Sequence, residues 1–71
     1  METIKLRETD DFIKLGQALK KAGLEGSGVD AKMDIQSGLV KVNGEIEERR
    51  GRKLYDGDVF EFNGMQVKVE K

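Results

Sequence analysis

The sequence predicts an α+β fold in which a two-helix hairpin packs on a small antiparallel β-sheet. Three observations predict it. Between residues 12 and 39, apolar residues recur at steps of three and four, the period of an amphipathic helix. Near both chain ends they alternate with polar residues, the period of a strand. Asn-Gly dipeptides at 43–44 and 63–64 indicate tight hairpin turns, whose central residues need positive φ.

The first strand is predicted over residues 3–8, where Ile4 and Leu6 face one side and their polar neighbours face the other. This alternation is typical of a half-buried strand. The two apolar side chains need an apolar partner, and the last strand of the chain is expected to leave one edge open. We therefore expect the first strand to join the C-terminal hairpin.

The first helix is predicted from Phe12 to Ala22, with Asp10 or Asp11 as its N-cap and Gly23 as its C-terminal stop. Spacing by three and four gives this segment a single apolar face. The residues on that face are Phe12, Leu15, Ala18, Leu19 and Ala22.

A second helix is predicted through "VDAKMDIQS", with Ser27 as its N-cap and Gly38 at its end. Its apolar face is thin, consisting of Val29 or Ala31 followed by Ile35 and Leu39. The two helices then form a hairpin whose apolar sides share one core.

The rest of the chain is predicted to be β-structure. "LVKV" and "DVFEF" each lead into an Asn-Gly turn, "MQVKV" follows the second one, and Asp56-Gly57 forms a third turn. The final hairpin places five side chains on one side as the floor of the core: Phe60, Phe62, Met65, Val67 and Val69. The residues expected to be nearly inaccessible are Leu15, Leu19, Ile35, Val42, Phe60 and Val67.

Composition argues against catalysis. The chain has 71 residues, which predicts one domain covering residues 1–71, and it lacks both cysteine and histidine. Catalytic sites need a nucleophile with a base, paired carboxylates in a cleft, or a metal. The adjacent acids Asp10-Asp11 and Glu47-Glu48 are expected to point apart or into solvent. We therefore expect no enzyme activity, no cofactor and no metal.

The chain has no apolar run of membrane-spanning length and no signal peptide, which makes the cytoplasm the expected compartment. We also expect a monomer. The net charge of −1 conceals a polarised distribution, since residues 1–12 and 54–71 each carry two cations and four acids. Positive charge is densest at Arg49–Lys53, where four cations occupy five positions.

Two interpretations of "RRGRK" have equal weight from the residues alone. The first is a solvated basic loop that keeps the protein soluble. The second is a binding loop, because it lies between two turns and its arginines have flat, forked donors that suit phosphate. Gly51 would let a backbone approach closely. In either case the loop is expected to lie outside the core.

The segments "IKLGQALKKAGL", "AKMDIQSG" and "GLVKVNGEIEERRGRKLYDGDVFEF" resemble the alpha-L RNA-binding motif, the domain of small-subunit ribosomal protein four. "RRGRKL" makes the chain most similar to stand-alone bacterial members. The resemblance implies two helices on a small sheet and binding of structured RNA, often ribosomal, through the helix hairpin and the β-loop. Transferred to this chain, the RNA-binding residues are Lys20, Lys21, Lys32, Lys41, Arg49, Arg50, Arg52 and Lys53.

Asp30 and Asp34 place negative charge near Lys32, which shifts the expected contribution from the second helix to the arginine loop. Tyr55 is the only aromatic residue beside that loop, since the three phenylalanines are assigned to the core, and this disfavours base stacking on single strands. The leading hypothesis is therefore a non-catalytic module that binds structured RNA, ribosomal RNA above all. The alternative is a protein-interaction domain that docks an acidic partner through Arg49–Lys53.

Overall fold

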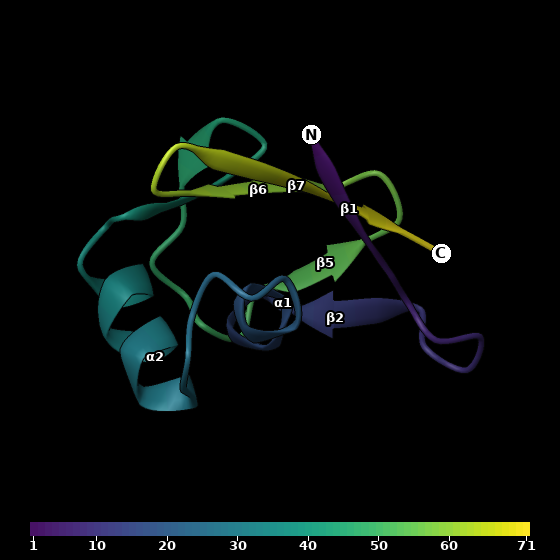
Figure 1. Ribbon diagram of the computed structural model, residues 1–71, viewed down its shortest axis with the longest axis horizontal. Coiled ribbons are helices and arrows are strands. Elements are labelled where there is room, and N and C mark those ends of the chain that lie inside the picture. Colours follow the sequence, from purple (N-terminus) through teal and green to yellow (C-terminus); the bar gives the residue numbers. More distant parts are fainter.

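Five of the seven strands form one sheet, and both helices lie on the same side of it (Figure 1). The computed structural model describes all residues, 1–71. The elements in chain order are β1 (Glu2–Lys5), β2 (Phe12–Lys14), α1 (Leu15–Lys21), α2 (Gly28–Gln36), β3 (Val40–Val42), β4 (Glu45–Ile46), β5 (Lys53–Tyr55), β6 (Val59–Phe62) and β7 (Met65–Glu70). Strands β2 and β5 pair with each other as a separate ribbon below the main sheet (Figure 1).

The main sheet has the strand order β1-β7-β6-β3-β4. As predicted, β1 joins the C-terminal hairpin, where Ile4 lies opposite Val69. It runs parallel to β7, whereas the other pairs in the sheet are antiparallel. The sheet is therefore mixed rather than wholly antiparallel, because the chain between β1 and β7 crosses from one end of the sheet to the other.

The two Asn-Gly turns are confirmed. Asn43 and Gly44 have φ values of 51° and 86°, and Asn63 and Gly64 have values of 56° and 80°. Both central residues of each hairpin therefore occupy the left-handed region, where asparagine and glycine are the least strained residues.

The core lies between the sheet and the helices and contains thirteen buried apolar residues. All six residues predicted to be inaccessible belong to it. The assignments of Met65 and Leu39 to the core are wrong. Met65 is 43% exposed near the hairpin tip, and Leu39 is 56% exposed because α2 has already ended at Gln36. On α2, the core residue is Ala31, since Val29 is exposed.

Helix α1 begins at Leu15, three residues later than predicted, because Phe12–Lys14 forms strand β2. Neither aspartate caps the helix. Asp10 instead forms an ion pair with Arg7, and Asp11 forms one with Lys71. The period-3.6 pattern predicts the helix correctly from Leu15 onward. Before Leu15, pairing with the distant strand β5 makes the chain a strand instead.

Helix α2 begins as predicted. The Ser27 hydroxyl accepts a hydrogen bond from the backbone N–H of Asp30 (3.2 Å), which satisfies one of the free donors at the helix start. Neither helix is long and apolar enough to cross a bilayer.

Candidate nucleic-acid interface

The basic run is fixed to α1 through its backbone. The N–H of Leu15 donates to the carbonyl of Arg52 (2.8 Å), and the N–H of Gly16 donates to the carbonyl of Arg50 (3.1 Å). The first N–H groups of a helix have no partner within it, and the loop supplies carbonyls in place of a capping side chain. The arginine loop and the start of α1 therefore form one structural unit.

Arg49 and Arg52 bind Glu47. The Glu47 carboxylate accepts from Arg49 Nε (3.0 Å), Arg49 Nη2 (3.0 Å) and Arg52 Nη1 (2.8 Å), and also from the Arg49 backbone N–H (3.1 Å). Glu47 is only 7% exposed. These donors lower the pKa of Glu47 to about 2, because they stabilise its ionised form more than burial disfavours it. Two of the four cations of the run are thus bound to an internal acid.

Glu48 is exposed, so the adjacent acids Glu47 and Glu48 do point apart, as expected. The burial of Glu47 differs from the expectation, and it means that the arginine loop is attached to the interior rather than lying wholly outside it. Glu47 lies in a segment rich in charged residues, which carries no sequence signal of burial.

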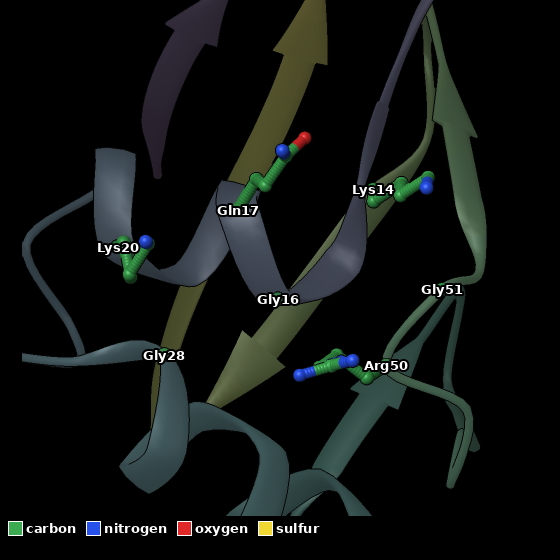
Figure 2. A pocket seen from close by; sticks show the side chains of 7 residues that line it. All are labelled: Lys14, Gly16, Gln17, Lys20, Gly28, Arg50 and Gly51. Carbon is green, nitrogen blue, oxygen red and sulfur yellow. The ribbon is translucent and has the colours of Figure 1, made fainter.

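The Arg50 side chain, unlike those of Arg49 and Arg52, does not bind Glu47. Its side chain lies against Gly16, where an added Cβ would be 2.8 Å from Arg50 Cγ and 3.4 Å from Arg50 Cδ. Real Cβ atoms do not approach so closely, so Gly16 leaves the space that Arg50 occupies. Figure 2 shows the guanidinium extending past Gly16 toward Gly28.

An open hollow of about 320 Å³ lies beside Arg50. No apolar residue lines it, and its residues are Lys14, Gly16, Gln17, Lys20, Gly28, Arg50 and Gly51 (Figure 2). The three cations take part in none of the four ion pairs of the structure. Small-molecule pockets are mostly apolar, so this lining suits a polyanion better.

Two of the predicted binding residues, Lys20 and Arg50, line this hollow, and Lys14 joins them although the sequence does not single it out. The sequence pattern puts Lys14 on the polar side of a longer helix. The feature that brings it here is the β2–β5 pairing, which places Lys14 opposite Lys53.

The other predicted residues lie elsewhere. The Lys21 ammonium donates to the carbonyl of Lys5, on the side of α1 that faces the N-terminal strand. Lys32 is one helical turn beyond Gly28, which puts both on one face of α2. Lys41 is exposed between two buried valines and lies opposite Glu61, on the sheet face away from the helices. A role for these residues in RNA binding stays a prediction.

Phe12, assigned to the core from the sequence, is only half-buried. It lies on β2 opposite Tyr55, and the centroids of the two rings are 5.9 Å apart. No group of three or more acidic side chains in the structure is arranged to hold a metal ion. The β2–β5 ribbon therefore carries two aromatic rings beside Lys14 and Lys53.

Comparison with known proteins identifies the fold. The S4 domain family matches residues 4–70. The probable ribosome maturation protein RlbA of Bacillus subtilis is 50% identical over 54 residues, which are 76% of each chain. The putative RNA-binding protein YbcJ of Escherichia coli is 39% identical over 57 residues, which are 80% of this chain and 81% of that one.

The solution structure of YbcJ, described as revealing an alpha-L motif involved in RNA binding, superposes with a TM-score of 0.74 and 35% identity. The match covers all of this chain and 89% of the other. The resemblance drawn from "RRGRKL" and its neighbouring segments is thereby confirmed. The chain belongs to the S4 domain family and has the α+β fold of the alpha-L motif.

Proposed function

We propose that this protein is a non-catalytic module that binds structured RNA, ribosomal RNA in particular, through the hollow lined by Lys14, Lys20 and Arg50. The observation that carries the proposal is that three cations without acidic partners surround a hollow that has no apolar lining. One relative is named as a putative RNA-binding protein, which supports RNA as the ligand. Another is named as a probable ribosome maturation protein, which supports a ribosomal RNA.

Charge and shape favour a folded RNA backbone. Double-helical RNA is recognised mainly through its phosphates and 2′-hydroxyls, because side chains do not enter its deep major groove. Arg50 is positioned by Gly16, which donates a hydrogen bond to the Arg50 carbonyl and lies against Cγ and Cδ of its side chain. A side chain whose first carbons are already positioned loses less conformational freedom when its guanidinium binds phosphate.

The proposal includes the absence of catalysis and of any bound metal or cofactor, a monomeric state, and a place in the cytoplasm. The acidic chain ends limit non-specific attraction to other polyanions. Lys53, Arg49 and Arg52 add positive charge around the hollow, although the latter two also hold Glu47.

The test is RNA affinity measured at several salt concentrations. Replacing Lys14, Lys20 and Arg50 together by glutamine should weaken binding to an RNA hairpin. It should also reduce the salt slope by about 0.7–0.9 for each phosphate contact removed. The matched control replaces Lys5, Lys68 and Lys71 by glutamine, which removes the same charge elsewhere.

Equal slopes for the two triple variants would contradict the proposal, because only net charge would then matter. Preferential binding of an acidic polypeptide over RNA at equal ionic strength would also contradict it, in favour of a protein-docking role.

A further inference from the structure

The β2–β5 ribbon carries four exposed or half-exposed side chains on one face. Directly opposite residues of an antiparallel pair project to the same side. Phe12 faces Tyr55 and Lys14 faces Lys53, while the intervening pair projects to the other side, where Leu54 is fully buried. The ribbon therefore presents two aromatic rings and two lysines together on its outer face.

The aromatic pair has an ordered arrangement. The rings of Phe12 and Tyr55 are tilted by 51° at a centroid separation of 5.9 Å, a geometry that stabilises aromatic pairs. The Lys53 ammonium lies 4.8 Å from the centroid of Phe12, within the range of a cation–π contact. Phe12 is thus covered by its two neighbours, whereas Tyr55 is 49% exposed. Tyr55 is the ring available to a ligand.

The lysine pair has no acidic partner within the protein. Like charges directly opposite each other in a sheet are unfavourable, and neither Lys14 nor Lys53 takes part in an ion pair. An anion beside them would remove this repulsion. Lys14 also lines the basic hollow, so the lysine pair connects the hollow to the aromatic pair. Lys53 and Tyr55 are two steps apart along β5, a distance of about 6.6 Å.

We infer that Tyr55, supported by Phe12, stacks with an unpaired RNA base while Lys14 and Lys53 hold the adjoining phosphate. The inference rests on the proposed function and specifies its ligand: a duplex with a bulged or terminal unpaired nucleotide beside the paired segment. A nucleobase fits because every base has a flat face that stacks on an aromatic ring, whatever its sequence. One accessible ring accommodates one base, so the site does not require an extended single strand.

The experiment compares two RNA hairpins of equal length, one fully paired and one with a single bulged 2-aminopurine. Three proteins are tested against both: wild type, Tyr55→Leu and Tyr55→Phe. Stacking on an aromatic side chain contributes about 1–3 kcal/mol per base, which corresponds to roughly 5- to 150-fold in affinity. Tyr55→Leu should lose this factor for the bulged hairpin and retain wild-type affinity for the paired one. Tyr55→Phe should bind both as wild type does.

The fluorescence of 2-aminopurine should be quenched in the wild-type and Tyr55→Phe complexes and remain unquenched with Tyr55→Leu. Equal affinity of Tyr55→Leu and wild type for the bulged hairpin would overturn the inference. So would an equal loss for both hairpins, which would indicate a structural role of the ring. A Lys20→Gln, Arg50→Gln double variant tests the proposed function separately, because neither residue belongs to the inferred base site. It should weaken binding of both hairpins alike.

Discussion

The four cations of the basic run fall into two pairs that make different contacts, although all four carry the same charge. Arg49 and Arg52 turn toward Glu47 and neutralise a buried carboxylate. Arg50 and Lys53 turn away from it, one into the hollow beside α1 and the other over the ring of Phe12. Cations that are equivalent in a charge count therefore divide into a pair that holds the loop and a pair that is available to a ligand.

The difference is set by what each side chain meets within the fold. An ionised carboxylate with little exposure is stable only when donors satisfy it, and the loop supplies arginines on both sides of Arg50. With Arg50 and Arg52 also bonded through their carbonyls to α1, the loop is positioned before any ligand binds. Arg49 and Arg52 thus serve to position Arg50 and Lys53, the two cations that do not bind Glu47.

The largest expected effect is on the free energy of unfolding, which should depend on Arg49 and Arg52 but not on Arg50. Replacing Arg49 and Arg52 by alanine leaves Glu47 as a buried charge without side-chain partners, which should cost about 3 kcal/mol of unfolding free energy. Arg50→Ala leaves no buried group unsatisfied and should change the unfolding free energy by less than about 0.5 kcal/mol. Urea unfolding monitored by circular dichroism measures both. Comparable losses in the two variants would remove the distinction.

Acid should weaken the Glu47 cluster specifically. The pKa of Glu47 is lowered from 4.5 to about 2, so its ionised form stabilises the fold fully above pH 4.5. This contribution is lost as the pH falls from 4.5 toward 2. The loss should be on the order of 2 kcal/mol. Unfolding free energies measured across that range should fall less steeply in Glu47→Gln, and identical slopes would contradict the assignment.

Glu25, between the helices, should show the opposite pH dependence. Burial, with the nearby Asp34 and Asp30, raises the pKa of Glu25 from 4.5 to about 7. Its neutral form is therefore favoured in the fold, and the stability it contributes is present below pH 4.5 and lost as the pH rises through 7. Glu25→Gln should remove this decline. Urea unfolding between pH 4.5 and 8 checks it, and a decline retained in the variant would refute it.

A substitution at Gly16 should displace Arg50 without disturbing the ion pairs of Arg49 and Arg52 with Glu47. Gly16→Ala places a Cβ 2.8 Å from Arg50 Cγ, which is too close, so the Arg50 side chain has to shift. Alanine favours helix by up to about 1 kcal/mol relative to glycine, which offsets most of the strain. We expect near-normal stability with RNA affinity lowered several-fold, measured by fluorescence anisotropy. Unchanged affinity would show that the position of Arg50 is unimportant.

The smallest effect is expected at Lys41, on the sheet face away from the hollow. Lys41→Gln should change RNA affinity less than Arg50→Gln does in the same titration, because only long-range charge is lost and salt screens it. A loss as large as that of Arg50→Gln would place an RNA contact on the outer face of the sheet.

The features that could be predicted from the sequence depend on local chemistry. The Asn-Gly turns, the Ser27 cap and the six inaccessible core residues follow from backbone preferences and side-chain period. The β2–β5 ribbon could not be predicted in this way, because Phe12–Lys14 pairs with residues about forty positions away. That pairing shortens α1 and brings Lys14 to the hollow.

Only part of the candidate site could be predicted from the sequence, because the rest also depends on contacts between distant segments. The family resemblance selects Arg50 and Lys20, and the structure places both at the hollow. The cap that Arg50 and Arg52 provide to α1 uses backbone carbonyls, which every residue type possesses. The attachment of two arginines to Glu47 depends on burial that only the folded chain creates.

The most direct test of the division within the run is the behaviour of individual arginine Nε–H signals in ¹H–¹⁵N NMR spectra during titration with an RNA hairpin. The Arg49 signal should already be protected from exchange in the free protein, because its Nε donates to Glu47 at 3.0 Å, and it should move little. The Arg50 signal should shift most and gain protection as RNA is added. If the Arg49 and Arg52 signals shift most while that of Arg50 stays at its free position, the arginines that hold Glu47 are the ones that contact RNA, and the proposed division of the run into holding and available cations is wrong.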